Sequence, residues 1–149
     1  MLLLIQYTLI FASVLALVAL GGCFSEHSGV INIGLEGIMV MGALGGALAM
    51  KFVPAGVPAI VMFLLVVLAS LLMGVLFSLL LGVAAINFNA DQTLVGTALN
   101  LMGTAAAVVI VRAINVAENP DNVSSTIVYR KAKQVFLVKI GDFEFNWFM

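Results

Sequence analysis

The chain has 149 residues, of which 64% are hydrophobic and 9% charged, and its mean hydropathy is +1.26. An average soluble domain is about 45–50% apolar and about 25% charged, so a soluble fold of this length would expose large apolar patches. The net charge of −1 does not decide for or against an anionic partner, and the basic residues, which apart from Lys51 all follow Val111, do not resemble a nucleic-acid-binding patch.

The first predicted element is a membrane helix over residues 2–20. Its apolar run is long, it lacks a basic leader region and further hydrophobic segments follow, so we interpret it as a spanning helix and not as a signal peptide. A glycine-rich stretch over residues 21–37 comes next, and we expect its backbone to be irregular.

Two apolar segments follow, and they differ in length. Residues 38–50 are apolar but short for a span, and Lys51, Pro54, Gly56 and Pro58 then interrupt the pattern. Residues 57–86 form a continuous apolar run. As a helix this run would be about 45 Å long, against a hydrocarbon core of about 30 Å, so it must tilt, protrude or break.

The last third of the chain is predicted to hold one more full span, over residues 94–111, after a polar turn at residues 87–92. Residues 115–134 are polar and indicate a loop. Residues 135–149 become apolar and aromatic, which suits a helix that enters the membrane interface, but they are too few to complete a span.

The predicted fold is therefore an all-α polytopic transmembrane protein. It has about four membrane segments, one of them short or broken, and an unfinished C-terminal one. We treat residues 1–149 as a single transmembrane domain and expect it to be the N-terminal portion of a longer protein.

The segment of residues 25–37 is the main candidate for function, because Glu26, Asn32 and Glu36 lie there among glycines. Irregular backbone at membrane depth is tolerated only where protein or a water-filled cavity surrounds it, so the segment fits a discontinuous helix near a transport path. Asn32 and Glu36 would share a face if the segment is helical. An ordinary aqueous loop, with Glu36 favoured in a first helical turn, explains the same residues equally well.

Small residues repeat every four positions along the long apolar run. They predict one helix face that packs closely against another helix, and a shorter version of the pattern precedes it. The stripe comprises Ser70, Gly74, Ser78 and Gly82, with Gly42 and Gly46 on the preceding segment.

Asn100 is the other polar candidate within a span, on a face that also carries Gly96 and Gly103. Asn100 either lines the path or makes an interhelical hydrogen bond, and the second is favoured about two to one on physical grounds, at about 0.6–2 kcal/mol. We find no phosphate-binding loop, no nucleophile–base set and no metal-ligand cluster beside the lone His27 and Cys23, so we expect no enzyme, cofactor or metal.

Two motifs, in this order, resemble a known family. LGGCFSEHSGVINIGLEGIMVMGAL and ADQTLVGTALNLMG are similar to recurring segments of permease subunits in ABC importers of the branched-chain amino acid, ribose and nucleoside group, and closest to the nucleoside branch that works with basic membrane proteins. The resemblance implies a multi-pass cell-membrane permease that works with a second permease subunit, ABC ATPase subunits and an extracytoplasmic solute-binding lipoprotein. Asn32, Glu36, Asn100 and, more weakly, Glu26 would then lie along or beside the solute path.

The orientation in the membrane receives two opposite predictions. The excess of Lys and Arg after Val111 places that segment in the cytoplasm, whereas the family resemblance places it outside. A re-entrant segment at residues 38–50 would reverse every later assignment. The leading functional hypothesis is a permease component of an ATP-driven importer for nucleosides or similar polar solutes, and the alternatives are a small membrane assembly protein or an oligomeric channel subunit.

Overall fold

The computed structural model describes residues 2–54, 56–127, 137–140 and 143–146. These contain the helices α1 (Leu2–His27), α2 (Leu35–Phe52), α3 (Ala59–Asn87) and α4 (Gln92–Glu118), and the strands β1 (Leu137–Ile140) and β2 (Phe143–Asn146). All four helices are long and apolar enough to cross a membrane. The predicted all-helical membrane architecture with four spans is confirmed.

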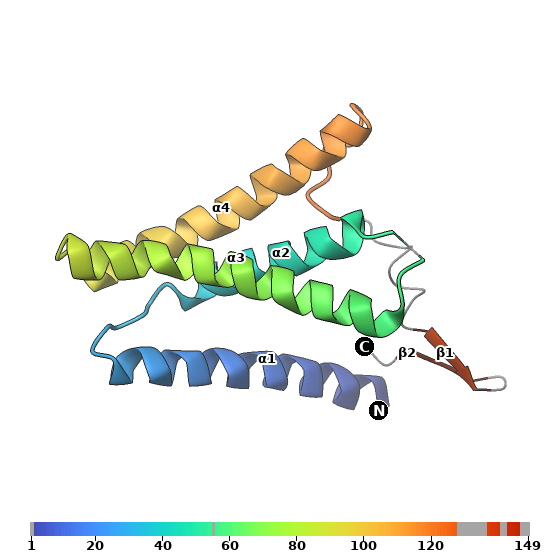
Figure 1. Cartoon of the computed structure of the whole chain (residues 1–149), viewed down its shortest axis with the longest axis horizontal. Coiled ribbons are helices and arrows are strands. Elements are labelled where there is room, and N and C mark those ends of the chain that lie inside the picture. The colour runs from blue at the N-terminus through green and yellow to red at the C-terminus, as the bar shows by residue number, and fades with distance from the viewer. Residues whose placement is uncertain (1, 55, 128–136, 141–142, 147–149) are drawn as a thin grey trace.

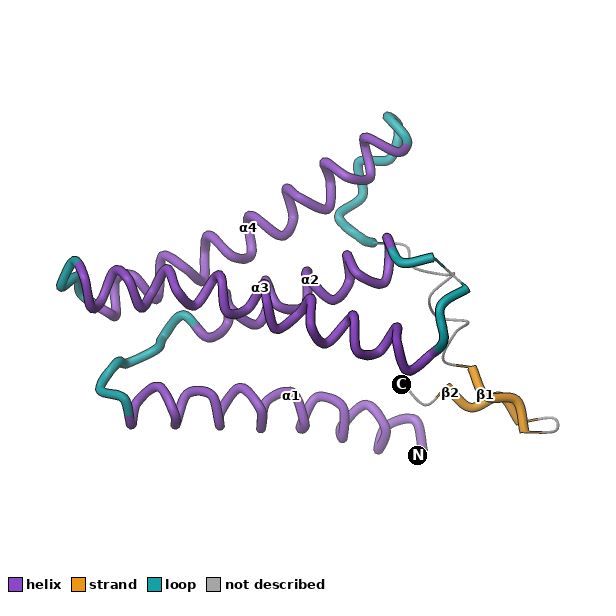
Figure 2. The backbone as a smooth tube through the Cα atoms, in the orientation of Figure 1, coloured by secondary structure: helices purple, strands orange, loops and turns teal. Residues whose placement is uncertain are grey.

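The four helices alternate in direction, and α2 lies between α3 and α4 (Figure 1). Its N-terminal residue Gly37 lies against Leu99 and Asn100 of α4, and Lys51 at its other end pairs with Glu118, so α2 and α4 run in the same direction. Because α2 is one continuous helix over Leu35–Phe52, the short apolar segment does not turn back as a re-entrant hairpin. Figure 2 shows the connections at these two ends.

Helix α2 packs tightly on α3 because both helices carry small residues at their contact. A Cβ added at Gly45 would lie 2.7 Å from the carbonyl oxygen of Ala69, and one at Gly46 would overlap the hydroxyl of Ser70. Met41 and Leu44 then join Phe77, Leu81, Leu99 and Val111 in the main core cluster. Helix α1 differs, because none of its described side chains is buried.

Two helix ends are set by local signals in the sequence. At the end of α1, the amide of Val30 donates to the carbonyl of Ser25 at 3.3 Å and that of Gly29 donates to Glu26 at 3.0 Å. This is the Schellman pattern, and Gly29 has the positive φ of +84° that the pattern requires. At the start of α4, the Asp91 carboxylate accepts from the amides of Thr93 and Leu94 at 2.8 and 3.2 Å.

Several predicted boundaries were wrong. The irregular stretch is shorter than residues 21–37, because α1 continues to His27 and only residues 28–34 are non-helical. Helix α4 extends to Glu118, into the predicted loop, and the polar residue Asn115 is buried in this extension. For the run at residues 57–86, the alternative of a break is removed, since α3 is continuous over Ala59–Asn87, and a helix that tilts or protrudes remains.

The predicted unfinished C-terminal helix is also corrected. Strands β1 and β2 pair antiparallel, with Lys139 opposite Glu144 and Val138 opposite Phe145. Polar residues alternate with apolar ones in FEFN, a period of two that favours a strand over a helix. Trp147 and Phe148, on which the interface prediction also rested, lie outside the described residues.

Candidate functional site

The start of α2 lies inside the bundle and not at its end. The amide of Gly37 bonds Asn100, which is eight residues into α4, and Ile38 lies beside Gly74, which is thirteen residues before the end of α3. At 1.5 Å per residue, α2 begins about 12–20 Å below the α3–α4 turn. The coil at residues 28–34 leads inward from the end of the bundle, since Ile31 bonds Gln92 at the start of α4 and Gly34 lies against Gly96. Where its backbone is enclosed by the helices, neighbouring protein must supply the hydrogen bonds.

Two amide side chains of α4 supply these bonds. Gln92 accepts from the amide of Ile31 at 2.7 Å. Asn100 donates to the carbonyl of Ile33 at 2.9 Å and accepts from the amide of Gly37 at 2.8 Å. Because Gly34, at the N-cap of α2, makes no side-chain cap bond, Asn100 caps α2 from the neighbouring helix.

Four glycines bring the two backbones close enough for those bonds. A Cβ added at Gly37 would lie 2.5 Å from the carbonyl oxygen of Leu99, and one at Gly103 would lie 2.9 Å from the backbone of Gly37. Gly34 and Gly96 face each other in the same way, with a Cβ at Gly96 2.9 Å from the Gly34 amide. We call Gly34, Gly37, Gly96 and Gly103 the glycine crossing.

The four predicted path residues occupy different environments. Asn32 lies in the coil before α2, so it does not share a helical face with Glu36, and its Oδ1 is a buried oxygen without a hydrogen-bond partner in the described part of the chain. Glu36 is exposed in the first turn of α2, and Glu26 is exposed in the last turn of α1. The polar atoms of Asn100 bond the backbone, as the interhelical alternative expected.

Only part of the predicted small-residue stripe makes close helix contacts in the described part of the chain. Gly42 and Gly46 both lie against Ser70, at the α2–α3 contact. Gly74 approaches Ile38 more loosely, at 3.9 Å, and a Cβ at Gly82 would meet nothing within 4 Å. The hydroxyl of Ser78 donates to the carbonyl of Val75 in its own helix.

A second polar cluster, at the other end of α2, was not anticipated. Lys51 Nζ lies 3.0 Å from Glu118 Oε2 and 3.4 Å from Asn115 Oδ1. The amide of Asn115 donates at 2.9 Å to the carbonyls of both Ser124 and Thr126. Two features of the sequence could have indicated it. Lys51 is a lone cation among apolar residues, and Asn115 follows Val111 by four positions, although Asn115 fell in the predicted loop.

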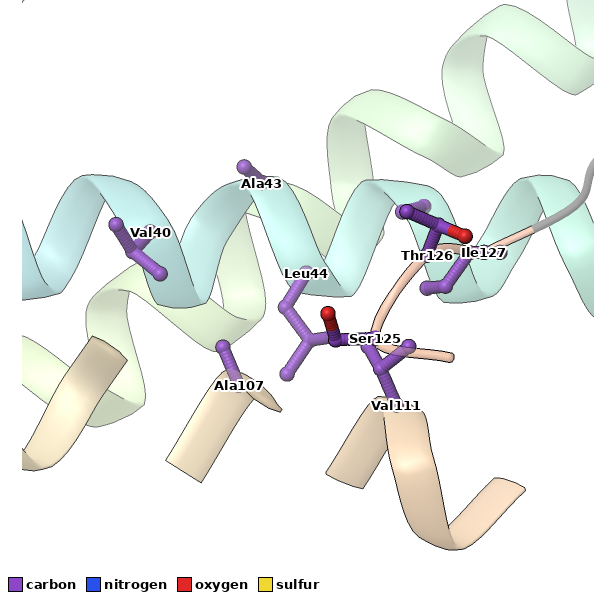
Figure 3. Close-up of a pocket in the computed structure, with 9 residues that line it drawn as sticks. Val40, Ala43, Leu44, Ala107, Val111, Ser125, Thr126 and Ile127 are labelled. Carbon is purple, nitrogen blue, oxygen red and sulfur yellow. The ribbon is translucent and has the colours of Figure 1, made fainter. Parts of the chain in front are cut away.

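Between the two polar ends, α2 and α4 diverge and leave an apolar groove of about 390 Å³ (Figure 3). Its walls are small and aliphatic side chains of the two helices, and residues 125–127 close one end. The lining residues are Val40, Ala43, Leu44, Ala47, Ala107, Val111, Ser125, Thr126 and Ile127. Within the described residues, no group of three or more His, Cys, Asp or Glu side chains could hold a metal ion.

Comparison with known proteins identifies what the chain is similar to. Residues 4–140 match the family described as branched-chain amino acid transport system / permease component. Over 107 residues the chain is 47% identical to the guanosine ABC transporter permease protein NupQ of Bacillus subtilis (strain 168), an alignment that covers 72% of this chain and 33% of that protein.

A second relative is the nucleoside ABC transporter permease protein NupC of Lactococcus lactis subsp. cremoris (strain MG1363). The two are 39% identical over 104 residues, or 70% of this chain and 32% of the relative. The chain thus spans about a third of the length of these two relatives. No solved structure matches it.

Proposed function

Because the chain belongs to the branched-chain amino acid transport system permease family, we propose that it is part of the membrane permease of an ATP-driven importer for nucleosides or related polar solutes. The observation that carries the proposal is the 47% and 39% identity to a guanosine and a nucleoside permease. The chain is a multi-pass component of the cell membrane, in a family of transport components and not of enzymes. That membership favours transport over the assembly-protein and channel alternatives.

The proposed permease works with partners and corresponds to the N-terminal portion of a longer polypeptide. Its partners are a second permease subunit, ABC ATPase subunits that hydrolyse the ATP, and an extracytoplasmic lipoprotein that captures the solute. Co-purification of an ATPase with the native permease, and an intact mass well above 15.7 kDa, are the expected results. A permease that purifies without an ATPase would favour the channel alternative.

The coil at residues 28–34 and the first turn of α2 are the proposed contact region for the solute. Broken helices whose ends lie at membrane depth are the usual solute sites of transporters. Nucleosides carry several hydroxyl and amine donors, and the oxygens of Asn32, within the break, and of Glu36, in the first helical turn after it, are acceptors. Asn100 supports the path by holding the broken backbone, and Glu26 is a gate or an external contact.

Uptake of radiolabelled guanosine by the assembled importer tests the path. We expect Glu36→Ala to reduce uptake about tenfold or more without loss of assembly, since a hydrogen bond to a charged group contributes about 1.5–3 kcal/mol. Asp121→Asn, which removes an exposed carboxylate from the loop after α4, is the matched control and should transport normally. Unchanged uptake by Glu36→Ala would remove that residue from the path.

Competition experiments test the solute class separately. Unlabelled nucleosides should suppress guanosine uptake, and leucine should not. Suppression by leucine at the same concentration would overturn the nucleoside assignment in favour of an amino acid permease.

We further propose that the end of the bundle with residues 119–127 faces outward, as the family resemblance implies and contrary to the charge rule. The connections at residues 28–34 and 88–91 lie at the opposite end (Figure 2). In a Cys23→Ser background, a membrane-impermeant thiol reagent added to intact cells should label Asp121→Cys but not Asn89→Cys. The reverse labelling pattern would establish the orientation that the lysines and arginines predict.

A further inference from the structure

The polar cluster at the C-terminal end of α2 joins that helix to the end of α4 and to the loop that follows α4. Asn115 is 3% exposed, and the side chain of Lys51 is 9% exposed. A buried amide and a buried ammonium are costly unless all their bonds are made, and here Asn115 bonds Lys51 on α2 and two carbonyls of the loop after α4. The burial and the shared partners make these contacts mutually dependent.

The loop after α4 is held across the groove as a strap, which we define as residues 124–127. The hydroxyls of Ser124 and Thr126 lie 2.6 Å apart and bond each other, which stiffens the strap beside Asn115. Ile127 packs against the core cluster. Figure 3 shows Thr126 and Ile127 beside α2, where both line the groove. The strap thus lines one end of the groove, and Asn115 binds it there.

The opposite end of the same helix pair is fixed in another way. At the glycine crossing the backbones of α2 and α4 touch, so this point can act only as a pivot. Lys51 lies fourteen residues beyond Gly37, about 21 Å along α2. At that distance from the pivot, a small change in the angle between the helices becomes a displacement of several ångströms.

We propose that Lys51, Asn115 and Glu118 form a latch that sets the angle between α2 and α4, with Asn115 as its positioning residue. Glu118 is 59% exposed, so its pairing with Lys51 is partly screened and contributes modestly. The latch is thus the part of the helix pair that can open without unfolding the bundle. Its effect on transport rests on the proposed function, but its effect on the helix angle does not.

Distances between spin labels on the permease in lipid nanodiscs test the latch directly. In a Cys23→Ser background, one pair at Phe52→Cys and Val116→Cys spans the α2–α4 opening. A control pair at Phe52→Cys and Leu64→Cys spans the tight α2–α3 contact, and all three sites are exposed. With the latch intact, both pairs should give one narrow distance.

We expect Asn115→Leu, which keeps roughly the size of the side chain but removes both its donors and the oxygen that binds Lys51, to broaden and lengthen the α2–α4 distance. The shift should be roughly 2–5 Å, the range of helix movements in switching transitions, with the control distance unchanged. Lys51→Glu and Glu118→Lys should each do the same, and the double exchange should restore the narrow distance. Glu118→Lys changes an exposed residue, so an unchanged α2–α4 distance in that variant overturns the proposal without a concern about folding.

Transport by the assembled importer supplies the second measurement. A latch that sets the helix angle should alter the maximal rate of guanosine uptake severalfold and leave the half-saturating concentration unchanged. An equal effect of all three single variants on assembly alone would make the cluster merely structural and overturn the proposal. If the unaltered importer takes up no nucleoside, the proposed function fails while the spin-label result still stands.

Discussion

The two ends of the α2–α4 pair are held together by opposite means. At the glycine crossing the four glycines place no side chain between the helices, and backbone atoms are in direct contact. At the latch the helices are further apart, and a lysine and an asparagine reach across to Glu118 and to the strap. The crossing depends on glycines, which have no Cβ to keep the backbones apart. The latch depends on side chains long enough to reach from one helix to the other.

This difference determines how each end responds to change. A backbone contact has no rotamers with which to adjust, so an added methyl group must move a helix. A contact made by long polar side chains can stretch, take up water at the exposed carboxylate or exchange partners. We therefore expect substitutions at the crossing to act on folding, and substitutions at the latch to act on the angle between the helices.

The largest effect should come from Gly37→Leu, which places a side chain between the two backbones at the glycine crossing. Its Cβ alone would lie 2.5 Å from the Leu99 carbonyl oxygen, and a backbone neighbour cannot rotate away. We expect no folded protein, measured as loss of a monodisperse peak in detergent size-exclusion chromatography. Gly82→Leu is the matched control, since a Cβ there meets nothing within 4 Å, and it should elute normally.

The sequence predicted the spans better than it predicted their contacts. Hydropathy and length located all four helices, because lipid demands about 20 apolar residues from every span, whatever its neighbours. The ends were less accurate, since α1 continues through Gly21 and Gly22 and α4 through Asn115. Inside a helix glycine costs about 1 kcal/mol relative to alanine and asparagine less, so neither residue ends a helix by itself.

The location of the candidate site could be predicted from the sequence, but the hydrogen-bond partners of its residues could not. The polar residues at 25–37 indicated a broken helix, but Asn32, Glu36 and Asn100 could not be assigned partners from spacing alone. Asn100 bonds Ile33 and Gly37, which are more than sixty residues away in sequence. The stripe ending at Gly82 was easier to see than Gly37 and Gly103, because regular spacing within one helix is visible and complementarity between two helices is not.

The second prediction concerns Asn100, whose side chain bonds the backbone beside the glycine crossing. Asn100→Leu leaves the amide of Gly37 and the carbonyl of Ile33 without their bonds at membrane depth. We expect a loss of about 1–3 kcal/mol of stability, seen as a lower thermal midpoint in detergent, because each unpaired buried group has its full desolvation cost.

Thr104→Val is the control for Asn100 on the same helix. The hydroxyl of Thr104 is exposed and bonds only carbonyls of α4, so its removal should leave the midpoint nearly unchanged. Equal losses for Asn100→Leu and Thr104→Val would mean that the bonds across to α2 carry no special weight, and that the close glycine contact alone holds this end.

The smallest predicted effect concerns two glycines in and after α1, and it tests whether a positive φ, and not lack of space, requires glycine there. Gly29 and Gly21 both have open space around them, but only Gly29 has a positive φ, +84°. Gly29→Ala should therefore destabilise the turn after α1 by about 1–2 kcal/mol, the cost of a left-handed backbone with a Cβ. Gly21→Ala lies in a helix and should stabilise it by about 0.5–1 kcal/mol. Thermal midpoints that move in opposite directions are expected, and a loss in both variants would mean that the end of α1 is packed against something that fills the space around Gly21.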